Sequence, residues 1–149
     1  MTSMSSLTKI QHQDSSMINP IGLLDTSVII DIEKLPAERL PNIFSVSALT
    51  LAELSAGLMA TDHLPTRVAR QLRLQNLESM VEVLPFDAYC ARAYASVFAA
   101  VRSIGRKPRG SRAVDYMIAA TAMQHRLPLF TRNPKDFEGL DGLIEIVAV

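Results

Sequence analysis

The chain has 149 residues, of which 48% are hydrophobic and 20% are charged, and its 15 acidic and 15 basic side chains balance. This length and composition predict one globular domain and exclude a disordered chain. The single cysteine excludes an intrachain disulfide and a paired-cysteine zinc site, and no apolar run approaches the ~20 residues of a membrane span.

The first residues of the chain are polar. Residues 1–17 contain one lysine and lack the apolar core of a secretory signal, so we expect a flexible tail there and one domain over residues 18–149. Met17 directly precedes the first apolar segment and is an alternative position for the start of translation. The single cysteine and the lack of a signal favour a cytoplasmic protein.

Five short apolar or alternating segments have the length and pattern of β-strands. They span residues 21–24, 43–47, 81–85, 129–131 and 143–147. Helices are predicted between them, over residues 27–34, 49–59, 66–80, 87–103 and 112–126. Strands that alternate with helices predict a three-layer α/β/α fold with a mainly parallel sheet of about five strands. In such sheets, sites form at the carboxyl ends of the strands.

Side-chain patterns on the predicted helices indicate their buried faces and their caps. On the third predicted helix, Val68, Leu72 and Leu77 are expected to face the interior. Asp87 is a good N-cap for the fourth helix, and Ser111 is expected to cap the fifth.

Positive charge is concentrated in one segment although the net charge is zero. Between Arg102 and Arg112 the chain has five basic residues and no acid, in a loop that is rich in glycine and proline. Such a loop suits the phosphate backbone of RNA, although each of its charges taken singly is also typical of a solvated loop. The candidates for RNA binding are Arg106, Lys107, Arg109 and Arg112.

Three acidic residues lie where strands end or helices begin. Asp25 follows the first predicted strand, where the alternative role is the N-cap of the next helix. Glu53 stands three residues after Thr50, which is also the spacing of a capping box. Asp115 lies in the first turn or so of an otherwise apolar helix, where the helix dipole favours a carboxylate by roughly 0.3–1 kcal/mol.

Asn133 and Asp136 follow the fourth predicted strand, in a segment that Asn-Pro also marks as a turn. In a parallel sheet with right-handed crossovers, these two positions and the three acids meet at one edge. Carboxylates that converge repel one another unless a cation lies between them, and hard oxygen ligands suit Mg²⁺ or Mn²⁺. We therefore expect a metal site that activates water for the cleavage of a phosphodiester.

Three segments resemble PIN-domain ribonucleases, and within them the VapC toxins of bacterial type II toxin–antitoxin modules. They are GLLDTSVII, SALTLAELSAGL and RAVDYMIAATAMQHRLPLFTRNPKDFEGL, in order from about residue 21 to the C-terminus. The resemblance implies a PIN fold and an endoribonuclease that depends on Mg²⁺, for which Mn²⁺ can substitute. It also implies that RNA cleavage inhibits translation and growth. As partners it implies a second copy of the chain and a cognate VapB-like antitoxin, which covers the active site in a toxin–antitoxin hetero-oligomer.

The resemblance also assigns roles to individual residues. Asp25 and Asp115 match the two metal-binding aspartates, and Glu53 matches the catalytic acid between them. The hydroxyl residues expected to support the site are Thr26, Ser27 and Thr131. Many PIN proteins have a fourth acid where this chain has Asn133, so the additional ligand is either Asn133 or Asp136.

Two alternatives to a metal-dependent ribonuclease remain from the sequence. One is a PIN-like protein-binding module without catalytic activity, which the departure at Asn133 favours. The other is an aspartyl nucleophile at Asp25, which needs a second acid two residues further on. Ser27 occupies that position, which argues against the nucleophile.

Overall fold

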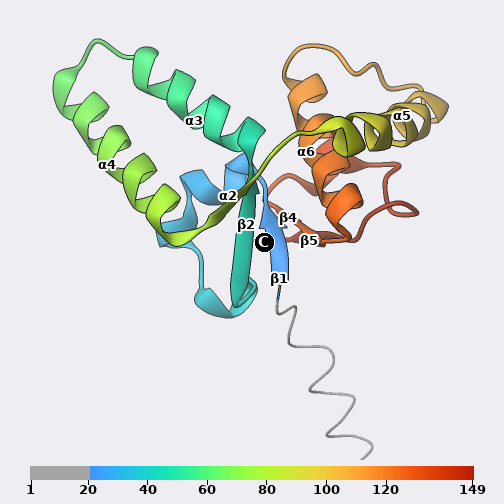
Figure 1. Cartoon of the computed structure of the whole chain (residues 1–149), viewed down its shortest axis with the longest axis horizontal. Helices are drawn as coiled ribbons and strands as arrows, with labels where there is room; N and C mark the ends of the chain where they lie inside the picture. Colours follow the sequence, from blue (N-terminus) through green and yellow to red (C-terminus); the bar gives the residue numbers. More distant parts are fainter. Residues whose placement is uncertain (1–20) are drawn as a thin grey trace, which may run out of the picture.

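The structure is a computed structural model that describes residues 21–149 (Figure 1). The predicted tail over residues 1–17 lies outside the described residues. Among those that are described, five strands form one sheet in the order β3-β2-β1-β4-β5, and every neighbouring pair is parallel. The strands are β1 (Ile21–Leu24), β2 (Ile43–Ser47), β3 (Glu82–Leu84), β4 (Leu129–Thr131) and β5 (Ile146–Ala148). The predicted α/β fold with a parallel sheet is confirmed.

The strand order changes direction beside β1. The chain builds β1, β2 and β3 outward in one direction, and then crosses back to place β4 on the other side of β1. Leu24, at the end of β1, pairs with Val46 on one side and with Phe130 on the other. Ligand sites of open α/β sheets form at the carboxyl end of such a switch point, and the residue that follows Leu24 is Asp25.

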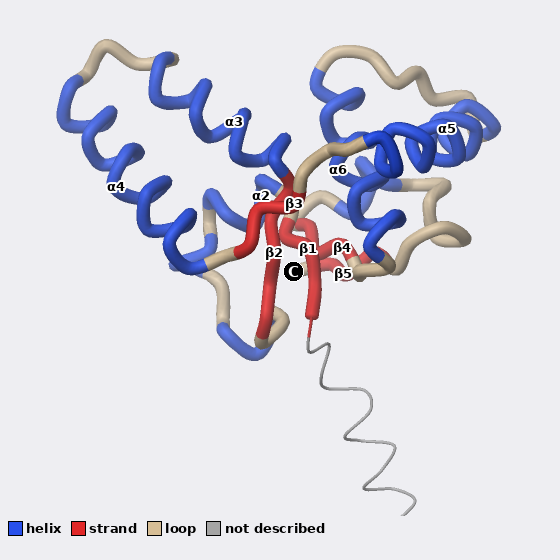
Figure 2. Tube along the Cα trace, in the orientation of Figure 1, coloured by secondary structure: helices blue, strands red, loops and turns tan. Residues whose placement is uncertain are grey.

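Helices cover both faces of the sheet (Figures 1 and 2). The α-helices are α2 (Thr26–Ile30), α3 (Ala48–Met59), α4 (Leu64–Met80), α5 (Ala88–Ser103) and α6 (Ser111–His125). Three short 3₁₀ segments are η1 (Ile32–Lys34), η2 (Ala37–Arg39) and η3 (Pro134–Phe137). Figure 1 shows α3 and α4 on one side of the strands and α5 and α6 on the other. No helix in residues 21–149 is long and apolar enough to cross a bilayer.

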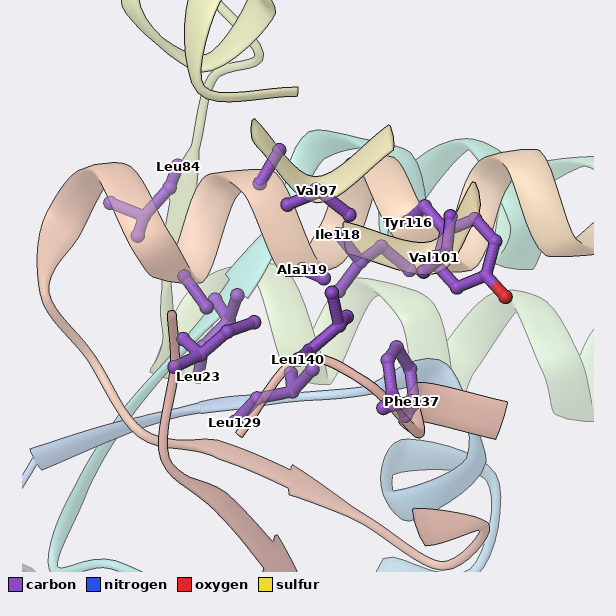
Figure 3. Close-up of a cluster of buried hydrophobic side chains, with 13 residues drawn as sticks. Leu23, Leu84, Val97, Val101, Tyr116, Ile118, Ala119, Leu129, Phe137 and Leu140 are labelled. Atoms are coloured by element: carbon purple, nitrogen blue, oxygen red, sulfur yellow. The ribbon is translucent and has the colours of Figure 1, made fainter. Parts of the chain in front are cut away.

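The period-two alternation of a strand explains these layers. Leu23 points to one face, where it joins a buried cluster with Val97 of α5 and Ile118 of α6 (Figure 3). Leu24 points to the other face, where it packs with Val28 and Ile29 of α2. Adjacent residues of one buried strand therefore anchor the two hydrophobic cores, and the strand leads directly into Asp25.

The last strand begins later than the sequence predicts. The expected strand over residues 143–147 is observed at Ile146–Ala148. The backbone N–H groups of Leu143 and Ile144 instead donate to the carbonyl of Leu140, which makes a turn. Both side chains still pack into the core, so their apolar character reflects burial in a turn.

Helix α4 presents a different face to the interior than the sequence predicts. Val68 and Leu72 are 47% and 56% exposed, while Leu74 is buried and Leu77 packs against the core as predicted. The Arg67 guanidinium donates to the backbone carbonyls of Leu58 and Thr61 at the end of α3. These contacts fix the rotation of α4 on α3 and turn an apolar stripe outward.

The two predicted caps have different outcomes. Asp87 caps α5 as expected, because its side chain accepts a hydrogen bond from the backbone N–H of Cys90 at 3.0 Å. Ser111 is wrong as the cap of α6, since it is the first helical residue and Gly110 holds the N-cap position. Gly110 has φ 62°, a left-handed conformation that glycine adopts without a steric penalty.

Gly22 of β1 allows the ring of Phe130 to lie directly against the strand. A Cβ at residue 22 would lie 2.7 Å from Cδ2 of Phe130, a residue that is 2% exposed and packs in the core. We expect Gly22→Ala to lower the free energy of unfolding by about 1–3 kcal/mol, as overpacking does in closed cores. Urea denaturation measures the change. Gly142→Ala is the control, since a Cβ there meets nothing within 4 Å; equal stability of the two variants would contradict this packing.

Candidate active site

Asp25 occupies the N-cap position of α2, but its side chain does not cap the helix. The backbone carbonyl of Asp25 accepts from Val28 and Ile29, while its carboxylate makes no cap hydrogen bond within the described chain. The residue is 5% exposed. A buried carboxylate needs other partners, so the helix-cap alternative for this side chain is wrong.

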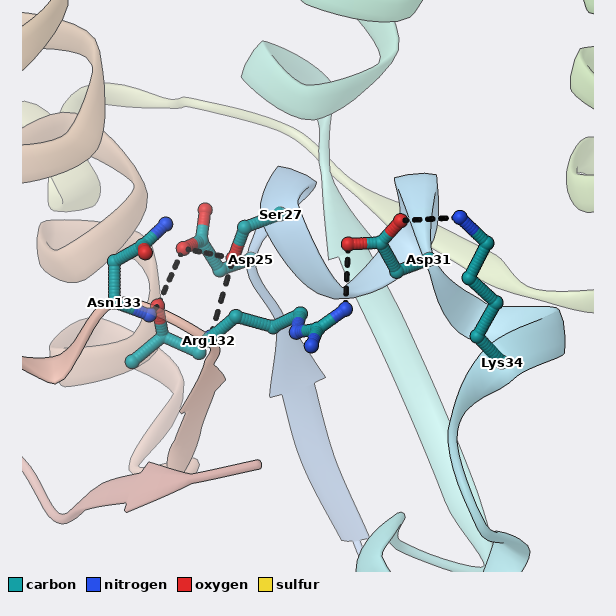
Figure 4. A network of polar contacts seen from close by, with 7 residues as sticks. Asp25, Ser27, Asp31, Lys34, Arg132 and Asn133 are labelled. Carbon is teal, nitrogen blue, oxygen red and sulfur yellow. Dashed lines mark hydrogen bonds and ion pairs between the residues drawn. The ribbon is translucent and has the colours of Figure 1, made fainter.

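Two hydroxyl groups bind the Asp25 carboxylate (Figure 4). Ser27 Oγ donates to Oδ2 at 3.0 Å, and Thr131 Oγ1 donates to the same oxygen at 2.7 Å. Each hydroxyl also accepts a backbone N–H of the turn after β4. Ser27 accepts from Arg132 at 3.2 Å, and Thr131 accepts from Asn133 at 3.0 Å. These N–H groups occupy the hydroxyl oxygens, and the hydroxyl protons point to Asp25.

Both hydrogen bonds reach the same oxygen of Asp25. Within residues 21–149, Oδ1 takes part in no hydrogen bond, and Figure 4 shows it directed away from the two hydroxyls. The carboxylate is therefore fixed in orientation through Oδ2 and presents Oδ1 to a further ligand. A carboxylate held in this way is suited to bind a metal ion, because its orientation is set before binding.

Glu53 lies one and a half turns into α3. The helix begins at Ala48, and its N-cap is Ser47, whose hydroxyl accepts from the N–H of Leu49. The capping box between Thr50 and Glu53 is therefore wrong. Instead, Thr26 Oγ1 donates to Oε1 of Glu53 at 2.7 Å.

The Thr26 hydroxyl has a second hydrogen-bond partner, the hydroxyl of Thr50. Thr50 Oγ1 lies 2.9 Å from Thr26 Oγ1. Thr26 gives its one hydroxyl proton to Glu53, so Thr50 must be the donor to Thr26. Thr26 thus orients Glu53, whereas the sequence placed it beside Asp25. Thr50, which is fully buried, was not predicted to support the site, although it lies one helical turn before Glu53 on the same face.

Asp115 lies near the other acidic side chains of the site. It is the fifth residue of α6, beyond the first turn in which it was expected. Its pKa is raised to about 7, first because burial disfavours the charged form and then because Asp25, Glu53 and Asp136 add like charges. No basic side chain of the described residues is among the causes of this shift. Asp25, Glu53 and Asp136 are therefore close enough to Asp115 for their negative charges to act on its carboxyl group.

The donors at this site are chemically suited to a hard divalent cation. They are carboxylate oxygens of like charge, which a cation would draw together. Within the described part of the chain, no three His, Cys, Asp or Glu side chains already lie in an arrangement that could hold a metal. The donor set therefore fits such an ion in chemistry and charge, and binding requires the carboxylates to move closer together.

The two candidates for the additional ligand differ in their surroundings. Asn133 is exposed, and its backbone N–H donates to Thr131. Asp136 lies in η3, is half-buried and is close enough to Asp115 to raise its pKa. Asp136 is therefore the acid that adds charge to the group, and Asn133 belongs to the turn that holds Thr131.

One of the four basic residues predicted to bind RNA already forms an ion pair within the chain. Arg106 donates to Glu138 at 2.8 Å, with 21% of its side chain exposed, which ties the loop to the end of η3. The other three predicted RNA contacts have exposed side chains without an ion pair in residues 21–149; they are Lys107, Arg109 and Arg112.

Sequence reasoning also missed an ion pair beside Asp25. Arg132 Nη1 donates to Asp31 Oδ2 at 2.6 Å, and Lys34 lies 3.9 Å from the other oxygen of Asp31 (Figure 4). The only signal in the sequence was the position of Arg132, between the two site residues Thr131 and Asn133.

Comparison with known proteins decides the family. The profile of the PIN domain matches residues 22–143, which is most of the chain. "Ribonuclease VapC5" of Mycobacterium tuberculosis is 35% identical over 133 residues, which cover 86% of this chain and 95% of that protein. This chain is a PIN-domain protein of the VapC family.

Solved structures of VapC-family complexes have the same fold. The crystal structure of VapBC-5 from Mycobacterium tuberculosis, described as a toxin–antitoxin system, matches with a TM-score of 0.76 and 35% identity, over 87% of this chain and 99% of that one. DNA-bound VapBC from Salmonella typhimurium matches with a TM-score of 0.66 and 28% identity, over 83% of this chain and 94% of that one. The predicted resemblance to the VapC family is confirmed.

Because the pKa of Asp115 is raised, we expect this residue to make the free energy of unfolding depend on pH. Without metal, the folded state binds this proton more tightly than the unfolded state, so stability falls as the pH rises from about 4 to about 7 and then levels off. Asp115→Asn removes this loss. At about pH 8 in EDTA, we expect the variant to be more stable than the wild type, on the order of 1 kcal/mol after solvent screening at this partly exposed group.

Urea denaturation between about pH 4 and pH 8 tests this effect. Asp141→Asn is the matched control, because it removes one exposed carboxylate outside the group. A variant at Asp115 that gains no more stability than the control at high pH would show that neither burial nor the neighbouring carboxylates destabilise the charged form of Asp115.

Proposed function

We propose that this VapC-family chain is the toxin of a type II toxin–antitoxin module and an endoribonuclease that depends on Mg²⁺. Cleavage of cytoplasmic RNA would inhibit translation and growth until the cognate VapB-like antitoxin neutralises the toxin. One observation carries the proposal: Asp25, Glu53 and Asp136 lie close enough to Asp115 for their negative charges to raise its pKa, and Asp25 directly follows the strand at the switch point of the sheet.

Mg²⁺ fits this region, and Mn²⁺ has the same preference for oxygen ligands. Asp25 and Asp115 would hold the ion, with Glu53 and Asp136 completing the negative charge around it. When bound, such an ion activates water and stabilises the charge that develops on the phosphodiester.

The chain's own residues prepare this chemistry. Ser27 and Thr131 hold Asp25 by one oxygen, which leaves the other oxygen available to a metal ion. Thr26 holds the Glu53 carboxylate by a hydrogen bond of 2.7 Å. This orientation reduces the reorganisation needed when substrate binds, which is where much of the rate enhancement of such sites originates.

The exposed residues of the basic loop are suited to hold RNA. Lys107, Arg109 and Arg112 precede or begin α6, the helix that carries Asp115. Their side chains are exposed, so they can bind phosphates without first breaking an ion pair within the described chain. Arg106 is the exception among the four candidates, since it already pairs with Glu138.

The partner surface lies on the other side of α2. A cavity of about 410 Å³ runs from Thr26 and Glu53 along α4 and is lined by apolar residues such as Leu54 and Leu77. We infer that it receives a segment of the antitoxin, because relatives with the same fold are solved as VapBC complexes and because a chain in this cavity would reach Glu53. The exposed stripe of Leu64, Val68 and Leu72 on α4 extends the apolar surface available to the antitoxin or to a second toxin copy.

Replacement of Asp25 tests the proposed catalysis. Asp25→Asn keeps the size of the side chain and both hydroxyl neighbours but removes the charge that would bind the cation. We expect RNA cleavage in Mg²⁺ to fall about a hundredfold or more, since loss even of a supporting contact around a metal costs 10–100-fold. Gel assays of RNA incubated with purified protein measure the rate, and induction in cells measures growth arrest.

The control for this experiment is Asp141→Asn, which should cleave RNA and arrest growth as the wild type does. If Asp25→Asn retained wild-type cleavage and arrest, the metal-dependent mechanism would be wrong. If the wild type arrested growth without cleaving RNA, the chain would act instead as an inactive PIN-like binding module.

A further inference from the structure

A second cavity adjoins Asp25 on the side of α2 that faces β4. It has a volume of about 400 Å³ and is lined by Ser27, Ile30, Asp31, Arg132 and Asn133. Three of these residues belong to the hydrogen bonds around Asp25, because Ser27 donates to its carboxylate while the backbone N–H groups of Arg132 and Asn133 donate to Ser27 and Thr131. The cavity is large enough for part of a nucleotide, and it opens next to the proposed site of cleavage.

Arg132 is the basic residue among the five that line this cavity. Its side chain is 37% exposed, and the guanidinium bonds to Asp31 through Nη1 alone among the described residues. The remaining N–H groups are available to a ligand. Its backbone N–H is held by Ser27, which itself holds Asp25. Arg132 is thus tied to Asp25 through one intervening side chain.

The surroundings of Arg132 favour a phosphate as its ligand. The neighbouring carboxylates repel the RNA backbone, so a phosphate next to the cleaved bond needs a cation on the protein side. Guanidinium binds phosphate through two parallel N–H groups, a geometry that a simple ammonium lacks. The five lining residues include no aromatic side chain on which a base could stack, which points to the sugar and phosphate rather than to the base.

Asp31 holds Arg132 in the absence of RNA. Its carboxylate lies between the Arg132 guanidinium and Lys34, at 2.6 Å from the first and 3.9 Å from the second (Figure 4). Asp31 is itself partly exposed, at 31% of its side chain. A phosphate that enters the cavity competes with Asp31 for Arg132 and is also repelled by it, so Asp31 weakens RNA binding while it keeps Arg132 in place.

We propose that this cavity is a subsite for the sugar and phosphate of the nucleotide next to the cleaved bond, with Arg132 as the phosphate ligand. The proposal rests on the ribonuclease function proposed above and adds a contact outside the basic loop. Ile30, which is 53% exposed, supplies an apolar wall for the ribose. A subsite of this kind binds the backbone of any sequence and does not read the base.

Fluorescence anisotropy with a short single-stranded RNA of randomised sequence tests the subsite. EDTA prevents metal-dependent cleavage, and the salt concentration is varied. We expect Arg132→Ala to weaken binding about tenfold and to reduce the slope of log K against log salt by about 0.7, the contribution of one phosphate contact on a single strand. Arg132→Lys should retain the slope and lose part of the affinity, because it keeps the charge without the planar fork.

The variant Asp31→Asn tests whether Arg132 binds RNA directly or only supports the fold through its ion pair with Asp31. If Asp31 competes with phosphate, this variant binds RNA more tightly than the wild type. If the ion pair only supports the fold, Asp31→Asn and Arg132→Ala weaken binding alike, and the subsite is wrong. The control is Arg39→Ala in η2, which removes an exposed arginine just before the start of β2, at the opposite edge of the sheet.

Melting curves verify that each variant is folded, as expected for a partly exposed pair. Wild-type affinity and salt slope in Arg132→Ala, together with RNA cleavage by the wild type, would overturn the subsite and leave the ribonuclease function standing. A wild type that neither binds nor cleaves RNA would instead overturn the proposed function, and the subsite with it.

Discussion

The two hydroxyl hydrogen bonds to Oδ2 of Asp25 connect the parts of the site. Ser27 comes from the helix after β1, and Thr131 ends β4, which is more than a hundred residues away in sequence. Each hydroxyl is also held by a backbone N–H of the turn after β4. These hydrogen bonds therefore join the start of α2 to the end of β4 at the switch point of the sheet, around the buried Asp25 carboxylate. Its other oxygen, Oδ1, makes no hydrogen bond within residues 21–149.

Helix α2 divides the surroundings of this charge into two sides. Its first residue, Thr26, orients Glu53 and lines the apolar cavity that we assign to the antitoxin. Its second residue, Ser27, holds Asp25 and lines the polar cavity that we assign to RNA. Ile30 contributes to both cavities. The two cavities are therefore lined by the two residues that directly follow Asp25 in the chain.

The sequence predicts the parallel α/β fold and four of the strands closely, because their apolar runs are bounded by clear breaks. It fails where packing overrides a local pattern, as at the exposed Val68 and Leu72 on α4. The acids were found by their positions at strand ends and helix starts, and the family resemblance supported them. The hydroxyls of Thr26, Ser27 and Thr131 were expected to support the acids, and each binds one of them. The roles of Thr50 and Asp31 could not be predicted, because they depend on side-chain geometry that no spacing encodes.

The most direct test of the account is the affinity for Mn²⁺ in Thr131→Val, measured by electron paramagnetic resonance. The substitution keeps the shape of a buried side chain and removes the shorter hydrogen bond to Asp25. We expect binding to weaken about ten- to a hundredfold. Thr121→Val is the matched control, since that buried hydroxyl donates only to the carbonyl of Met117 in its own helix. Equal Mn²⁺ affinity in the two folded variants would contradict the claim that the hydroxyls prepare Asp25 for a metal ion.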